Sequence, residues 1–184
     1  GEDTQLITNQ VFRDVAAWDH IVVRIDTSQS TEADRVRIYV NGEQETSFST
    51  ASYPPHTHDY NCLGDAGALH YVGCAVSGSV ASPSPYDYFN GYIADFIQSS
   101  GQSYAPTSFG ETDSTTGIWK PKTFSGSFGD NGFHLQFKNS GALGTDTSGE
   151  GHTLTVSGAG TNAQVVDTPT NNFATMNSLA NSTQ

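Results

Sequence analysis

The chain has 184 residues, 35% of them hydrophobic, and contains 19 Gly, 7 Pro and a single Met. This length suffices for one substantial domain, and a composition rich in turn formers predicts many short strands, that is, an all-β protein. A formal net charge of −12 with no cluster of Lys or Arg argues against binding to nucleic acid, and no apolar run approaches the roughly 20 residues of a membrane-spanning helix, so we predict no membrane insertion.

The first convincing strands form a hairpin. "QLITNQVF" (residues 5–12) begins as a strand, and in "HIVVRID" (20–26) and "RVRIYVNG" (35–42) the residues alternate with the period of a half-buried strand. Asn-Gly at 41–42 supplies the positive φ values of a tight turn, and the polar loop 27–34 is expected to be solvated. One set of side chains is predicted to pack against a second layer: Ile21, Val23, Ile25, Val36, Ile38 and Val40.

The next segments alternate between strands and loops. Residues 43–50 predict a return strand that carries Phe48, residues 51–61 a loop with two prolines, and residues 68–76 another strand. The Pro- and Ser-rich residues 77–88 predict a second loop. "FNGYIADFIQSS" (89–100) is apolar on both faces, so we expect a central strand between packed layers.

The second half of the chain is poorer in strand signals. Residues 101–131 are turn-rich, with a brief strand signal at 118–120, and predict a connector packed on the preceding sheet. "GFHLQFKN" (132–139) alternates again, and residues 152–158 are expected to pair with it across the turn at 144–151. The tail beyond residue 158 is polar and predicts no core strand.

The chain has two cysteines, Cys62 and Cys74. The loop between them is short enough to be closed by a disulfide, and two free buried thiols are an equal alternative, so the pair does not decide the redox compartment. Zinc is not expected, because no second Cys pair or close His pair completes a tetrahedral ligand set.

Three ordered motifs, "WDHIVVRID", "RIYVNGEQ" and "FNGYIADF", carry a family resemblance. In order and spacing they resemble the laminin-G-like, concanavalin A-like lectin domains over about residues 18–98. The resemblance implies an antiparallel β-sandwich of the jelly-roll type. Longer stretches, among them "VFRDVAAWDHIVVRIDT" and "LGTDTSGEGHTLTV", are similar to tail-fibre and other structural proteins of marine bacteriophages.

The resemblance also implies a division of the chain. Domains of this family place several strands before the Trp-x-His strand, where only residues 1–17 stand here, so we expect a sandwich that is incomplete at its N-terminus. An open sheet edge or strands borrowed from a partner would follow. We predict this partial sandwich over residues 1–100, a turn-rich connector over 101–131, and over 132–184 a strand pair with a polar tail that resembles the start of a second jelly roll.

Two loops carry the residue types that bind sugars. Aromatic rings stack on the apolar face of a sugar, while polar groups bond its hydroxyls. The alternative is that the rings only cover the edge of the sandwich. The predicted glycan-binding residues are Tyr53, His56, His58, Asp59 and Tyr60 in one loop, and Tyr86 and Tyr88, beside Asp87, in the other.

Calcium is the one candidate cofactor. Its oxygen ligands are predicted in "DTSGEG", from Asp146, Ser148 and Glu150, with Asp26 and Asp95 as further candidates at strand ends. A local turn in which the side chain bonds its own backbone explains Asp146 without a metal. His56 and His58 face one side of an extended segment, so they could ligate a transition metal together with a third ligand.

Residues 111–116 come nearest to a catalytic motif. Glycoside hydrolases of the concanavalin A-like fold carry Glu-x-Asp-x-x-Glu on one strand and work with paired carboxylates, whereas here Glu111 and Asp113 are followed by Thr116. A Gly-x-Ser-x-Gly nucleophile elbow and a Gly-Lys-Ser/Thr phosphate loop are also missing. We therefore predict that the chain is not an enzyme.

Together these features predict a virion-associated, extracellular adhesion protein of the phage type. Its lectin-like sandwich is expected to bind host-surface polysaccharide or other glycans, and its partners are expected to be further virion subunits in an oligomer. The alternative is a non-catalytic assembly or decoration module of a virion that has no glycan ligand.

Overall fold

The computed structural model describes residues 4–14, 17–58, 69–79, 81–158 and 163–165. These residues form a mostly β structure, as the composition predicts. Its helical turns in the described ranges are α1 (Glu32–Arg35) and the 3-10 turn η1 (Pro106–Ser108). None of the helices described is long and apolar enough to cross a bilayer.

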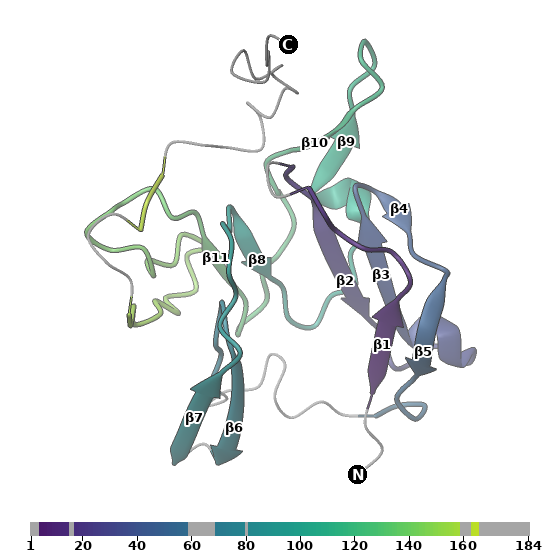
Figure 1. Cartoon of the computed structure of the whole chain (residues 1–184), viewed down its shortest axis with the longest axis horizontal. Coiled ribbons are helices and arrows are strands. Elements are labelled where there is room, and N and C mark those ends of the chain that lie inside the picture. Colours follow the sequence, from purple (N-terminus) through teal and green to yellow (C-terminus); the bar gives the residue numbers. More distant parts are fainter. Residues whose placement is uncertain (1–3, 15–16, 59–68, 80, 159–162, 166–184) are drawn as a thin grey trace, which may run out of the picture.

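The strands pair into small antiparallel sheets of two or three strands (Figure 1). On the right of that view lie the β1–β5 pair and the three-stranded sheet β2–β3–β4, and on the left lie the β6–β7 and β11–β8 pairs. The β9–β10 hairpin projects at the top. The bounds are β1 Gln5–Thr8, β2 Ile21–Ile25, β3 Val36–Val40, β4 Glu43–Gln44, β5 Phe48–Ser52, β6 Ala75–Ser79, β7 Ser82–Tyr86, β8 Phe96–Gln98, β9 Gly110–Thr112, β10 Trp119–Pro121 and β11 Phe133–Leu135.

The sheet β2–β3–β4 contains the predicted hairpin. Ile21 of β2 pairs with Val40 of β3, and the turn into β4 has φ of 50° at Asn41 and 86° at Gly42, which confirms the predicted Asn-Gly turn. Asn41 adds side-chain hydrogen bonds, because its Oδ1 accepts the His20 N–H and its Nδ2 donates to Asp19, each at 2.9 Å. The polar segment before β3 is exposed or half-buried, as predicted, and ends in α1.

The prediction of one inner face on this hairpin was wrong for its first strand. Ile21 and Val23 are 49% and 56% exposed, whereas Val22, on the opposite face, is 9% exposed. Val36 and Val40 are buried as predicted, and Ile25 and Ile38 are half-buried. Val22 pairs with Tyr39 of β3, which is also 9% exposed, so the face opposite the predicted inner one is covered at this point as well.

The predicted strand at 68–76 and loop at 77–88 also need correction. Strand structure begins only at Ala75, and the Pro- and Ser-rich segment forms β7, paired along its length with β6. Pro83 and Pro85 are compatible with a strand because residues two apart point the same way, and a two-stranded sheet leaves one side of β7 without a ladder to interrupt.

The expected central strand at 89–100 is reduced to β8 at its end. Phe89 and Tyr92 are 58% and 61% exposed, so this stretch does not lie between two layers. Asp95 adopts a positive φ of 56°, a conformation that ends an extended run. The predicted strand at 132–139 is confirmed as β11, although residues 152–158 form no strand beside it. Instead Leu135 bridges to Asp146.

Aromatic rings make up much of the core. Phe133 and Leu135 are 1% and 2% exposed, and the Phe133 ring stacks on Phe96 with a centroid distance of 5.7 Å. A second stack joins Phe109 to Phe124 at 4.9 Å. Rings contact one another in the order Phe109, Phe124, Phe128 and His134, so the η1 segment is connected to β11.

Trp119 connects the β9–β10 hairpin to the β2–β3 hairpin. Its Nε1 donates to His20 Nδ1 at 3.1 Å, and burial lowers the pKa of His20, against an opposing effect of Asp95, which favours the neutral ring that accepts this bond. The indole lies so close to Gly42 that a Cβ there would stand 2.5 Å from it. Glycine at position 42 therefore allows both the positive φ of the turn and the close packing of the Trp119 ring.

Replacing Phe133 with Ala should reduce the free energy of unfolding by about 3–5 kcal/mol, because the change leaves a cavity in the aromatic core. Chemical denaturation followed by tryptophan fluorescence measures this. Phe89→Ala is the matched control, since the exposed ring should cost less than about 0.5 kcal/mol. Equal losses for the two variants would contradict the assigned core.

Candidate functional site

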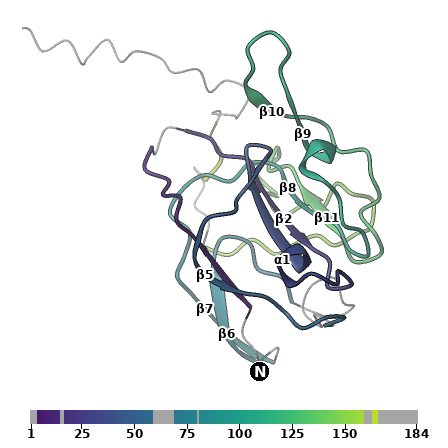
Figure 2. The same ribbon diagram turned by 90° about the vertical axis from the view of Figure 1, so that its right-hand side faces the viewer.

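A groove of about 130 Å³ opens between α1 and strands β3, β4 and β5. Figure 2 faces this side of the molecule, with α1 and β5 toward the viewer. Two half-buried aromatic rings and several polar groups share the groove, which is the combination that a sugar ring requires. The lining residues are Ala33, Val36, Arg37, Gln44, Glu45, Thr46, Phe48 and Tyr53.

The groove exists because the chain changes sheets between β4 and β5. After the Asn-Gly turn, the Glu45 N–H still donates to the Ile38 carbonyl at 2.8 Å. Three residues later, Phe48 pairs with Thr8 of β1 instead of with β3. The connection therefore leaves the β3 side with Glu45 and Thr46 at the rim and Phe48 on the wall.

Arg37 supplies the positive charge of the groove. Its guanidinium lies 2.6 Å from Asp34 Oδ1, and the two side chains are 25% and 37% exposed. A hydrogen bond to Asp34, followed in importance by one to Tyr39, raises the pKa of Arg37, so the guanidinium is always charged. The Nε–H is buried and has no hydrogen-bond partner among the described residues. With Glu45 on the same groove, the lining carries charges of both signs.

A second arginine fixes the loop that holds Tyr53. Arg35 donates to three backbone carbonyls, from Nε to Gln29 at 3.0 Å, from Nη1 to Pro54 at 2.8 Å, and from Nη2 to Ser30 at 3.0 Å. Its guanidinium therefore joins the loop before α1 to the loop after β5. Since Pro54 is fully buried beside Tyr53, the ring of Tyr53 is carried on an anchored backbone.

The predicted histidines take part in the same anchoring. His56 Nε2 lies 3.0 Å from the Ser28 carbonyl, and the Thr57 N–H donates to the Thr27 carbonyl at 2.8 Å. His58 is exposed and its N–H bonds to the Pro55 carbonyl. Neither histidine lines the groove. Asp59 and Tyr60, the other two predicted residues of this loop, lie outside the described residues.

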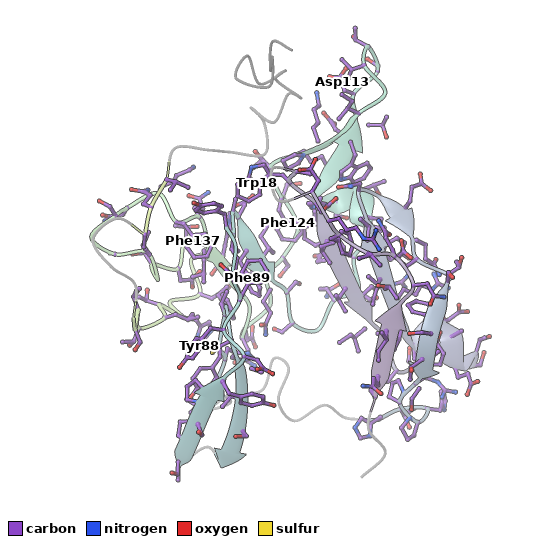
Figure 3. All side chains as sticks on the ribbon, viewed as in Figure 1. Trp18, Tyr88, Phe89, Asp113, Phe124 and Phe137 are labelled. Carbon is purple, nitrogen blue, oxygen red and sulfur yellow. The ribbon has the colours of Figure 1, made fainter. Side chains whose placement is uncertain are left out.

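The second predicted loop is a separate surface. Tyr86 ends β7, at the lower left of Figure 1, whereas β5 lies on the right. Tyr86 and Tyr88 are 47% and 72% exposed, and Asp87 between them has a positive φ of 46°. Figure 3 shows Tyr88 just above β6 and β7. The structure does not bring these tyrosines to the groove that Tyr53 lines.

Sequence reasoning missed most of the groove. Arg37, Glu45 and Thr46 line it, but Arg37 was not among the side chains predicted to pack inward, and the other two were assigned to a continuous return strand. The signal that would have identified them is the polar run "EQET" before Phe48, which interrupts the alternation and marks a change of sheet.

The predicted calcium ligand Asp146 is occupied by hydrogen bonds. Its carboxylate accepts the N–H groups of His134, Ser148 and His152 and the Ser148 hydroxyl, at 2.8–2.9 Å. Burial raises the pKa of Asp146, but the four hydrogen bonds outweigh it and lower the pKa to about 2. Asp146 thus closes the 146–152 turn against β11, in agreement with the alternative that its side chain bonds the local backbone without a metal.

The other candidate ligands are also engaged or isolated. Glu150 is exposed, and Ser148 donates to Asp146. The Asp26 carboxylate accepts hydrogen bonds from Ser28 and Gln29, while Asp95 bonds to His134 at 2.5 Å. Within the described ranges, no group of three His, Cys, Asp or Glu side chains could hold a metal ion. Calcium binding stays a prediction, with no ligand set assembled for it there.

Glu111 and Asp113 lie on the projecting β9–β10 hairpin, where Figure 3 labels Asp113. Both carboxylates pair with the Lys120 ammonium, at 3.4 and 3.1 Å. Hydrogen bonds from the Thr116 backbone and from Lys120 hold the pKa of Asp113 far below its ordinary value. A catalytic acid needs the opposite shift, so this arrangement serves the turn.

Cys74 is a half-buried free thiol in the described part of the chain, while Cys62 lies outside it.

Comparison of the chain with protein-family models, with curated proteins and with solved structures found no match.

Replacing Arg35 with Lys should destabilise the protein by about 1–3 kcal/mol, because an ammonium cannot reach three carbonyls as the planar guanidinium does. The amide of Thr57 should exchange faster with solvent, since the loop it joins is loosened. Denaturation and amide hydrogen exchange measure the two effects. Arg13→Lys, at an exposed arginine, is the control, and equal effects of both changes would exclude an anchoring role of Arg35.

Replacing Asp146 with Asn should lower stability at pH 7, and the difference from the unaltered protein should disappear as pH falls. A carboxylate with a depressed pKa contributes stability above its unfolded value near 3.9 and loses this contribution as pH falls toward the folded value. Here that window runs from about pH 4 to about pH 2. Denaturation across this range measures it, with Asp130→Asn as an exposed control.

The unaltered protein and the Asp146→Asn variant together test the calcium prediction. If the hydrogen bonds of Asp146 account for its role, the melting temperature is the same in calcium and in chelator. A clear rise in calcium that is lost in Asp146→Asn would contradict the purely structural role.

Proposed function

We propose that this chain is a carbohydrate-binding module that serves a phage-like virion protein in attachment to host-surface glycans. The observation that carries the proposal is the groove at Phe48 and Tyr53. It combines two aromatic walls with an arginine, an amide, a carboxylate and a hydroxyl at its rim. Sugar-binding sites need this mixture, because a sugar has apolar C–H faces and polar edges.

The charges in the groove favour a neutral sugar. Arg37 is already neutralised by Asp34 at 2.6 Å, and Glu45 adds an acceptor beside it. An anionic ligand would face Glu45 and Asp34, and a cationic one would face Arg37. A hydroxylated ring without charge can use the donors and acceptors of both without burying an unpaired charge.

The size of the groove favours a single sugar unit. Its volume of about 130 Å³ lies well below the roughly 300 Å³ at which pockets for drug-sized ligands begin. The anchoring of Tyr53 through Pro54 and Arg35 supports binding at low entropic cost, because the ring is held before the ligand arrives.

The finer fold that accompanies this proposal is a laminin-G-like β-sandwich. It is supported by the antiparallel pairing of β2 with β3 and by the Asn-Gly turn that closes "RIYVNG".

A structural role in virion assembly is the second candidate, and a specific observation favours it. Several rings in the segment between β7 and β8 are exposed, with Tyr88, Phe89 and Tyr92 at 72%, 58% and 61%. Exposed apolar surface of this kind is typical of protein interfaces. The partners would be other virion subunits in an oligomer, and the location the virion or the extracellular space.

Replacing Tyr53 with Ala should weaken binding to neutral host polysaccharide at least about tenfold, because a buried aromatic contact is often worth more than 1.4 kcal/mol. A glycan array identifies the ligand and titration calorimetry measures the affinity. Circular dichroism verifies that the β structure is retained. Tyr92→Ala is the control, since this ring is exposed and does not line the groove.

Two results would contradict the proposal. If Tyr88→Ala abolishes binding while Tyr53→Ala leaves it unchanged, the sugar binds at the exposed rings instead of the groove. If the unaltered protein binds no glycan of a broad array, the assembly role is favoured.

A further inference from the structure

A second and larger pocket, of about 280 Å³, lies between η1 and the segment after β10. It shares no lining residue with the groove at Tyr53. Its walls combine two aromatic rings, three hydroxyl side chains and one ammonium group. The lining residues are Tyr104, Thr107, Ser108, Lys122, Phe124, Ser125 and Gly126.

The aromatic side of this pocket is rigid. Phe124 is 9% exposed and lies edge-on to Tyr104, at 5.2 Å between centroids and 81° between planes. The Tyr104 hydroxyl accepts the Ser127 N–H at 2.9 Å, and Figure 3 shows Phe124 in the interior of the molecule. The wall is thus formed before any ligand binds.

The backbone opposite the rings is held closely against them. A Cβ at Gly126 would lie 2.6 Å from the Phe124 ring and 2.8 Å from the Tyr104 ring. The Lys122 N–H donates to the Phe109 carbonyl at 2.9 Å, which fixes the segment at its other end. Lys122 therefore projects from an anchored backbone beside a fixed aromatic wall.

The charge of this pocket differs from that of the groove. The Lys122 ammonium forms no hydrogen bond or ion pair with the described residues, whereas Lys120, two residues earlier, pairs with Glu111 and Asp113. None of the residues that line the pocket is acidic. In a chain with 19 acidic and 7 basic residues, this is a positive charge with no carboxylate to neutralise it.

The hydroxyl groups of the pocket are also free. Thr107, Ser108 and Ser125 line it, and their side chains form no hydrogen bond with other described residues. Each hydroxyl can donate and accept, which suits the hydroxyls of a sugar. The pocket thus offers one cation, several two-way hydrogen-bonding groups and an aromatic wall.

We propose that this pocket binds a sugar residue that bears a carboxylate, such as a uronic acid. Lys122 pairs with the carboxylate, the hydroxyl side chains bond the ring hydroxyls, and Tyr104 contacts the apolar face of the ring. The choice of a saccharide rests on the proposed function, while the choice of an anion rests on Lys122 alone. Acidic polysaccharide would then be bound at a site separate from the neutral-sugar groove.

The test uses the full chain and an oligogalacturonate, compared with its methyl ester, which has the same rings without the charge. Calorimetry at physiological ionic strength should show at least about tenfold tighter binding of the acid form. Lys122→Met should remove this preference, and Lys122→Arg should retain it. Lys138→Met, at another exposed lysine, is the control and should bind as the unaltered protein does.

Three outcomes would overturn the inference. Equal binding of acid and ester, or an unchanged acid preference in Lys122→Met, would show that Lys122 does not select the ligand. Inorganic phosphate that competes at equal concentration would show that the pocket takes any small anion. The proposed function is tested separately, because Tyr53→Ala should weaken neutral-sugar binding and leave the binding of the oligogalacturonate unchanged.

Discussion

Contacts between aromatic rings hold together a chain whose sheets are too small to be stable alone. Isolated two-stranded sheets are at best marginal in water, and most sheets among the described residues have two strands. The ring stacks Phe96–Phe133 and Phe109–Phe124 supply the buried apolar area that the sheets lack. Because these rings come from strands and turns far apart in the sequence, they also determine which segments lie next to each other.

Hydrogen bonds from charged side chains to the backbone give the long loops a second level of order. Arg35 joins two loops through three carbonyls, and Asp146 closes a turn through three N–H groups and a hydroxyl. Such bonds take the place of sheet ladders where the chain is neither strand nor helix. Residues whose type suggests a ligand are therefore engaged in hydrogen bonds to the backbone. The groove depends on such bonds, because Arg35 holds the loop that carries Tyr53.

The sequence predicted local structure better than it predicted packing. The period-2 alternation identified β2, β3 and β11, and the Asn-Gly pair identified its turn, because these depend on neighbouring residues only. Val22 is buried together with its cross-strand partner Tyr39, whereas Val23 is exposed, and alternation alone cannot reveal which face of a strand is covered. The strand β7 was missed because prolines were taken to exclude pairing, although an edge strand tolerates them.

Of the residues that line the groove, the sequence predicted only Tyr53 as a site residue. Composition alone singled out a loop with several rings and histidines, but His56 turned out to bond the Ser28 carbonyl. Arg37 and Phe48 come from strands whose faces could not be assigned without knowing the sheet change after β4. Lining residues from separate segments are brought together by the fold, so spacing in the sequence carries no signal for them.

Local charge, and not net charge, decides what the two recessed sites can select. The chain as a whole is at −12, and its field opposes any approaching anion. Salt screens that field over about 8–10 Å at physiological ionic strength, so a ligand in contact with Lys122 experiences mainly the ammonium beside it. At lower salt the repulsion by the whole chain reaches further and opposes this contact. Salt therefore has two opposite effects on the affinity for an acidic sugar, because it weakens both the attraction by Lys122 and the repulsion by the whole chain. A neutral sugar at Tyr53 is subject to neither effect.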